Sequence, residues 1–411
     1  MQTLTPPNSA PVAINLPFSN AACMLPPVCP VDVGAELLRL NQCSAEQAPA
    51  LRFIPLHKDN EQAWTDLQAS LPEQAVGYDH VHCAYQHLYF SSHSSAYQVL
   101  DCLLYWQEQV IGIWPLACYQ SQDGETKRWQ LSSHLNGTFG ICAPLLIPQL
   151  SAKQEKMIAR AWLSAVAQLA SDFAIESLSF AAPLGTNNLP HWYHELLTLG
   201  AQLSARHSLV AELNLSAAAY QQQLRKSYKG LINQARKLWR SEIDSRGDRA
   251  QFAEFQRLHE QVAGRQTRNA STWEKQYEAI VHGAAYALYL RDAEQQLVGA
   301  SLFNCSRDEA YYAVGVYQRE LFAQPLAHLN LYEAITFARQ QGLHRLILGH
   351  RPYPNDQPAP SEKELQIAFF KEGFANQLIL QAQLSVSAQQ LSALLPTQQN
   401  QHPLTPHLAN A

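Results

Sequence analysis

The stretch that decides the fold runs from Ala310 to Gly349 and reads AYYAVGVYQRELFAQPLAHLNLYEAITFARQQGLHRLILG. Its start is rich in aromatic and β-branched side chains, which predicts a strand over Ala310–Tyr317. Pro325 then stands at a first-turn position and Gly342 at a helix end, so we predict a helix between them. A second strand is predicted over Arg345–Leu348. A strand, a helix and a strand in this order form the core of a mixed sheet with packed helices.

Segments on either side of this core extend the sheet and cover it with helices. Upstream, we predict two strands and four helices, over Ala285–Arg291, Leu297–Cys305, Ser216–Lys226, Tyr228–Glu242, Arg249–Ala263 and Ser271–Val281. Downstream, Glu362–Glu372 predicts one more helix. Several short antiparallel strands that lead into a helix and back to a strand indicate an α+β fold with a mixed, mostly antiparallel sheet.

The length of 411 residues exceeds what one hydrophobic core usually holds, and it predicts two folded units. We place them at residues 51–215 and 216–395, between an irregular N-terminal arm (1–50) and a disordered tail (396–411). The elements predicted in the first unit are Trp64–Ser70, Tyr85–His93, Tyr97–Trp106, Gln109–Tyr119, Ala152–Asp172, Ser177–Ala181, Trp192–Leu199 and Ser208–Leu213. Both units follow a strand pair with a long helix and a strand, which leaves an ancient duplication open.

Composition argues against several classes of function. A net charge of −5 argues against DNA binding through overall charge. No apolar run is long enough for a membrane span, so no membrane insertion is expected. The eight cysteines are scattered, without C-x-x-C pairs or zinc-type histidine spacing, so we expect no metal site. The start of the chain lacks the basic region of a signal peptide, and we expect a cytoplasmic protein with reduced thiols.

Basic side chains gather on the helices that open the second unit: Arg225, Lys226, Lys229, Arg236, Lys237 and Arg240. At about 100° per residue these six fall within one third of the helix circumference, opposite an apolar third. Such a surface can be an ordinary solvated face. It can also bind a phosphate, pyrophosphate or carboxylate, and Arg225, Lys226 and Lys229 are then closest to the site because they lie where two helices meet.

Three stretches carry a family resemblance: LNLSAAAYQQQLRKSYKGLINQARKL at 213–238, the run 290–349 that contains the decisive stretch, and LQIAFFKEGF at 365–374. Together they resemble the Fem-type transferases and the related single-chain bacterial acetyltransferases. The resemblance implies two GNAT-like domains with a substrate cleft between or beside them. It implies direct transfer of an acetyl or other acyl group from acyl-coenzyme A to an amino group of a sugar, an amino acid or a cell-envelope precursor. It also places Lys371 near the substrate phosphate or the acyl donor.

Two departures from the family pattern keep alternatives open. The segment between Arg240 and Tyr286 is too short for the long two-helix arm of the staphylococcal-type enzymes, which makes aminoacyl-tRNA-dependent transfer less favoured. Phe322 stands where the family's pyrophosphate-binding loop has glycine, and Pro325 removes a backbone donor. Gln318 or Arg319 can supply the missing hydrogen bond or charge. A catalytically silent GNAT-like binding or scaffold protein is the third hypothesis.

Acyl transfer to an amine needs a deprotonated nucleophile, an oxyanion donor and good orientation, and no covalent residue. Tyr312 is a candidate proton donor or orienting hydroxyl, although a packed tyrosine is the more ordinary case. His328 is a candidate base, with a structural hydrogen bond as its alternative. His350 and Arg351 follow the last strand of the core, where mixed sheets tend to place ligand contacts. The expected partners are therefore a small-molecule amine and an acyl donor.

Overall fold

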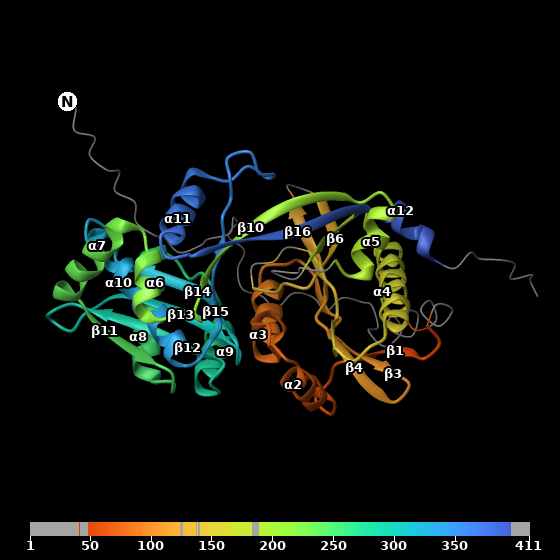
Figure 1. Cartoon of the computed structure of the whole chain (residues 1–411), viewed down its shortest axis with the longest axis horizontal. Coiled ribbons are helices and arrows are strands. Elements are labelled where there is room, and N and C mark those ends of the chain that lie inside the picture. The colour runs from red at the N-terminus through yellow and green to blue at the C-terminus, as the bar shows by residue number, and fades with distance from the viewer. Residues whose placement is uncertain are drawn as a thin grey trace, which may run out of the picture.

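The computed structural model of the chain describes residue 41 and residues 48–123, 126–136, 138, 140–182 and 189–395. The predicted tail (396–411) and nearly all of the predicted arm (1–50) lie outside these residues. Within the described residues, no helix combines the length and apolar character that a bilayer span requires. Figure 1 shows two units side by side, each with its own helices.

The first unit combines short strands with four helices in its described part. Its strands are β1 (Leu51–Pro55), β2 (Tyr97–Val99), β3 (Cys102–Trp106), β4 (Gln109–Trp114), β5 (Ala117–Asp123), β6 (Thr126–Ser132), β7 (Ile141–Cys142), β8 (Leu145–Leu146) and β9 (Ser177–Ala181). Its helices are α2 (Glu61–Ser70), α3 (His80–Ser91), α4 (Ala152–Asp172) and α5 (His191–Thr198), with a short 3₁₀ turn, η1 (Val76–Tyr78).

The second unit alternates helices and strands around one large sheet. Its strands are β10 (Gln202–Glu212), β11 (Arg240–Asp244), β12 (Ala285–Arg291), β13 (Leu297–Cys305), β14 (Glu309–Tyr317), β15 (Arg345–His350) and β16 (Gln377–Ser387). Its helical elements are α6 (Ala217–Gln223), α7 (Lys226–Leu238), α8 (Arg249–Ala263), α9 (Ala270–Val281), η2 (Arg319–Leu321), α10 (Leu326–Gln340) and α11 (Glu362–Glu372). The two elements that follow β16, α12 (Ala388–Leu391) and η3 (Ser392–Leu394), pack on α4 of the first unit. The predicted α+β fold class is confirmed.

One nine-stranded sheet runs through both units in the order β11-β12-β13-β14-β15-β10-β16-β9-β7. Its two long central strands, β10 and β16, pair antiparallel and cross from one unit to the other along one side of the molecule (Figure 1). We call this pair the bridging ribbon. A four-stranded sheet, β1-β3-β4-β8, and a three-stranded sheet, β2-β5-β6, complete the first unit.

The hydrophobic cores follow the sheets. In the second unit, α6, α7, α10 and α11 cover one face of the sheet, and α8 and α9 cover the other. In the first unit, α4 packs its apolar face on the sheet and begins at a capping box formed by Ser151 and Gln154. Leu384 and Val386 of β16 belong to the core of the first unit. The predicted division at residues 215 and 216 stays a prediction, because the bridging ribbon contributes to both cores.

One predicted helix is too long. The helix expected over Tyr228–Glu242 ends at Leu238, because Trp239 adopts an extended backbone (φ −128°, ψ 141°). Residues 240–244 then form β11, which pairs with β12 at the edge of the sheet. Pairing with a neighbouring strand decides the conformation here, whatever the local propensity. Arg240 therefore lies on a strand and leaves the predicted basic helix.

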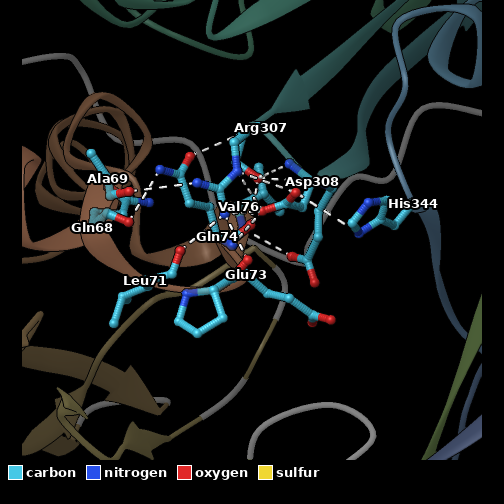
Figure 2. A network of polar contacts seen from close by, with 12 residues as sticks. Gln68, Ala69, Leu71, Glu73, Gln74, Val76, Arg307, Asp308 and His344 are labelled. Atoms are coloured by element: carbon cyan, nitrogen blue, oxygen red, sulfur yellow. Dashed lines mark hydrogen bonds and ion pairs between the residues drawn. The ribbon is translucent and has the colours of Figure 1, made fainter. Parts of the chain in front are cut away.

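A polar network ties the two units together (Figure 2). The turn between β13 and β14 meets the loop that follows α2, and Arg307 donates to the carbonyls of Leu71 at 3.0 Å and Pro72 at 2.8 Å. The buried Asp308 carboxylate accepts the amide of Gln74 at 2.7 Å. Glu309 accepts the amide of Val76 at 2.9 Å. We call this network the hairpin lock; it fixes the start of β14 against the first unit.

Candidate active site

The two parallel strands at the centre of the second unit run together only briefly. Strands β14 and β15 pair at Glu309, Ala310 and Tyr311, opposite Arg345, Leu346 and Ile347. From Tyr312 to Tyr317, no strand in the described part of the chain pairs with the β15-facing edge of β14. Unpaired backbone groups at the carboxyl ends of parallel strands are a common place for ligands, and an extended ligand can bind such an edge as an added strand.

Lys371 occupies the space next to this opening. It lies in α11, its side chain is buried at 4% exposure, and its Nζ atom is 4.6 Å from the centroid of the Tyr312 ring. A Cβ atom at Gly349 of β15 would lie 3.3 Å from Nζ. No described residue hydrogen-bonds or ion-pairs with this ammonium. Burial lowers the pKa of Lys371 to about 8, so the group is mostly charged at neutral pH and can lose its proton just above it.

Tyr312 and Tyr317 face the same side of β14. Their hydroxyl oxygens are 3.4 Å apart. Burial raises the pKa of Tyr312 to about 12 and that of Tyr317 well above its ordinary value. Both therefore keep their protons at neutral pH and act as hydrogen-bonding hydroxyls. Tyr317 has no role in the sequence-based hypotheses, because nothing in its local pattern distinguishes it from a core residue.

His328 lies in the first turn of α10 among aromatic rings. Its ring meets Tyr228 edge-on at 4.6 Å and Phe370 at 5.0 Å between centroids. Burial, with a smaller contribution from the charge of Arg225, lowers the pKa of His328 to about 4. A neutral imidazole results, and it is chemically able to accept a proton. Helix α10 also begins without a side-chain cap, since Pro325 occupies the N-cap position.

Arg225 is bound to α11 by several contacts. Its backbone amide donates to the carbonyl of Gly373 at 3.0 Å. Its guanidinium donates to the carbonyl of Phe369 at 2.9 Å and to the hydroxyl of Tyr228 at 3.1 Å. Tyr228 in turn donates to the carbonyl of Phe370 at 2.9 Å. Arg225 and Tyr228 thus hold the carbonyl end of the helix that carries Lys371, and we call these contacts the α7–α11 clamp.

Four of the remaining predicted cations, Lys226, Lys229, Arg236 and Lys237, are exposed on α7, and one, Arg240, is not on this helix. Arg236 pairs with Glu333 at 2.9 Å, and Arg240 lies on β11. The predicted basic helix face is therefore wrong only in including Arg240. Anion binding by Lys226 and Lys229 stays a prediction.

The loop between β14 and α10 holds the two residues predicted to bind the cofactor. The side-chain amide of Gln318 donates to the carbonyl of Leu297 at 3.1 Å. Arg319 is exposed in η2, close to the free end of β14. Arg319 is thus the better placed of the two for a ligand phosphate.

The two residues predicted after β15 lie next to α11. His350 ends β15, and Arg351 pairs with Glu372 at 3.0 Å, adjacent in sequence to Lys371. The backbone amide of Arg351 donates to the carbonyl of His207 on β10 at 2.8 Å. These contacts place the loop after β15 beside the bridging ribbon and near the opening. A role for either residue in binding substrate stays a prediction.

The corresponding junction of the first unit is closed by its own side chains. Strands β7 and β9 run parallel at Ile141 and Cys142. Trp114 donates to the carbonyl of Cys142 at 3.1 Å, and Tyr78 donates to that of Ala143 at 2.7 Å. The next helix, α4, starts at the capping box described above. The second unit is therefore the better candidate for the active site.

Comparisons with known proteins agree with this architecture. No protein-family model and no curated protein sequence matches the chain. The solved structure of FemX superposes with a TM-score of 0.57 at 12% identity, over 82% of this chain and 98% of FemX. A conserved protein of unknown function from Bacteroides thetaiotaomicron gives 0.48 at 10% identity, over 81% and 99%. The tandem GNAT protein from the clavulanic acid biosynthesis pathway gives 0.45 at 14%, over 82% and 98%. The match to FemX confirms the resemblance to Fem-type proteins as a shared fold.

Proposed function

We propose that this chain is an N-acyltransferase that moves an acyl group from acyl-coenzyme A directly to an amino group. The observation that carries the proposal is the buried ammonium of Lys371 beside the opening between β14 and β15, with which no described residue hydrogen-bonds or ion-pairs. Burying an unpaired charge is costly, and groups with perturbed pKa values concentrate at functional sites. In a silent binding module, the third hypothesis from the sequence, such a group would serve only to bind an anionic ligand.

The chemistry follows from the groups around the opening. The acceptor amine attacks the thioester carbonyl, a C–N bond forms, and negative charge develops on the carbonyl oxygen. The ammonium of Lys371 stabilises this oxyanion, and the C–S bond then breaks to release coenzyme A as a thiolate, which takes a proton from water or from the imidazolium of His328 to become the thiol. The amine loses one proton, for which neutral His328 is the proposed acceptor, directly or through water. No covalent enzyme intermediate is needed.

Donor binding is proposed on the same side of the second unit. The extended arm of the coenzyme would pair with the unpaired edge of β14. Its phosphates would meet the uncapped start of α10, with Arg319, Lys226 and Lys229 as counter-charges. The acceptor is proposed to be the amine of a sugar, an amino acid or a cell-envelope precursor, met in the cytoplasm.

Aminoacyl transfer from tRNA is the alternative within the same fold. An aminoacyl ester and an acyl thioester develop the same oxyanion, so Lys371 could serve either donor. The segment between Arg240 and Tyr286 holds α8 and α9, which pack on the sheet through Phe252 and Trp273. No long two-helix arm extends from it, which favours the coenzyme A donor.

Ligand-induced stabilisation tests the proposal. We expect acetyl-coenzyme A to raise the melting temperature of the wild-type chain, and amino sugars or amino acids to release thiol from it. Lys371→Met should abolish thiol release. Lys363→Met, which changes an exposed lysine on the same helix, should not. Stabilisation by aminoacyl-tRNA alone would favour transfer from tRNA. If no donor raises the melting temperature, a binding module is favoured.

A further inference from the structure

On the face of β14 that α10 covers, Tyr312 is the residue next to Lys371. A register shift between β13 and β14 beside Phe303 leaves Tyr312 and Gly315 as successive residues on that face. The phenol of Tyr312 lies flat along the strand and over Gly315, so that a Cβ atom at position 315 would collide with its hydroxyl. β-Bulges of this kind re-aim side chains near active sites. Glycine at 315 is thus required for the position of the Tyr312 ring.

Aromatic side chains hold the Tyr312 ring on the face opposite Lys371. Phe303 stacks on it at 5.1 Å and 21°, and Tyr286 stacks on Phe303 at 5.0 Å and 10°. Its hydroxyl reaches the hydroxyl of Tyr317. A close-packed row of three rings has no space into which Tyr312 could retreat. In front of the ring, the ammonium of Lys371 lies 4.6 Å from its centroid.

We propose that Tyr312 limits the donor to short acyl groups such as acetyl. The inference rests on the proposed function, in which the acyl carbonyl binds the ammonium of Lys371. An oxygen that accepts a hydrogen bond from Nζ is bound to a group that itself lies 4.6 Å from the centroid of the Tyr312 ring, so we expect the carbons that follow the carbonyl to extend along this ring. The role of Tyr312 is then to determine specificity through its ring, and the hydroxyl is dispensable for it.

Two substitutions separate the ring from the hydroxyl. Tyr312→Phe keeps the wall, while Tyr312→Ala opens a space in front of Phe303 large enough for several methylenes. Calorimetry on the full chain should show wild-type and Tyr312→Phe binding acetyl-coenzyme A at least about tenfold more tightly than hexanoyl-coenzyme A. Tyr312→Ala should bind the hexanoyl donor at least about tenfold more tightly than wild type does. If Tyr312→Ala fails to fold by near-UV circular dichroism, Tyr312→Leu tests the same change with a smaller cavity.

The outcomes distinguish this inference from the function on which it rests. Equal affinity of the wild-type chain for acetyl and hexanoyl donors overturns the inference and leaves acyl transfer intact. So does a folded Tyr312→Ala or Tyr312→Leu variant with unchanged chain-length preference. Failure of coenzyme A and of both acyl donors to bind the wild-type chain overturns the proposed function, and the inference with it.

Discussion

Nη2 of Arg225 donates a 2.9 Å hydrogen bond to the carbonyl of Phe369, which lies two residues before Lys371 in α11. A charged group expected from the sequence to bind an anion therefore serves first to hold the helix that carries the proposed oxyanion donor. Helix ends leave their last carbonyls without partners, and Arg225 and Tyr228 satisfy two of them.

Removing the clamp should impair transfer more than stability. We expect Arg225→Met to lower the catalytic rate constant at least about tenfold, because small displacements of a catalytic group are costly. The free energy of unfolding should fall by about 1 kcal/mol, the usual net value of a hydrogen bond. Steady-state kinetics measure the rate constant, and urea unfolding measures the free energy of unfolding. Arg236→Met, on the same helix, should change neither appreciably, and full activity in Arg225→Met would contradict the clamp.

The pH dependence of transfer should reflect two groups. Activity requires neutral His328, with a pKa of about 4, and protonated Lys371, with a pKa of about 8. The rate should therefore rise as pH increases through about 4, stay level, and fall as pH increases through about 8. In Lys371→Arg, any residual activity should lose the alkaline fall, because a guanidinium stays protonated there. A wild-type profile that keeps rising above pH 9 would exclude a charged Lys371 as the oxyanion donor.

The buried charge of Lys371 should also lower the free energy of unfolding. Its pKa in the folded chain is about 8, against an ordinary value of 10.5, so folding disfavours the charged form. The cost is full below pH 8, about 3 kcal/mol, and disappears as pH rises from 8 towards 10.5. We expect Lys371→Met to be more stable than wild type in urea at pH 7 and to lose part of this advantage at pH 9.5. An exposed control, Lys363→Met, should show no such gain, and a destabilised Lys371→Met would refute the argument.

The hairpin lock should make the chain sensitive to acid. Burial disfavours ionisation of Asp308, but hydrogen bonds from Arg307 and from the amide of Gln74 outweigh it and keep the pKa of Asp308 below its ordinary value. A carboxyl of this kind stabilises the fold above its unfolded pKa, and the contribution disappears as pH falls through the folded value.

Replacement of this carboxylate tests the effect. Asp308→Ala should lower the free energy of unfolding at pH 7 by about 1–3 kcal/mol, since the buried amide of Gln74 loses its acceptor. The difference from wild type should shrink below about pH 4. Glu294→Ala, an exposed change in the neighbouring hairpin, is the control. A constant difference between pH 3 and pH 7 would show that the charge of Asp308 is irrelevant.

Much of the fold could be predicted because its local signals are strong. Helix α4, with its serine cap, and strands β12 and β13, with their continuous apolar runs, have the predicted bounds. Strand β16 was not predicted, because its leucines alternate without a buried face along much of the strand: Leu378 is 47% exposed and Leu380 58%. Its conformation comes from pairing with β10, a partner nearly two hundred residues away in the sequence.

The site was less predictable, because it also depends on contacts between segments that are far apart in the sequence. Lys371 was named through the resemblance, yet its burial depends on how α11 meets β14 and β15. The sequence placed Arg225 correctly at a helix junction, but nothing in it indicates that the junction faces the carbonyls of α11. The position of the Tyr312 ring over Gly315 depends on a one-residue register shift that no sequence pattern signals.

The bridging ribbon also constrains how the chain can fold as it is synthesised. The core of the first unit contains Leu384, Val386 and Leu391, which are translated long after the rest of that core. Domains usually fold in order as they leave the ribosome. Here the N-terminal half cannot complete its core until β16 has been synthesised and has paired with β9. Until then, the apolar surface that β16 covers in the first unit stays exposed in the nascent chain.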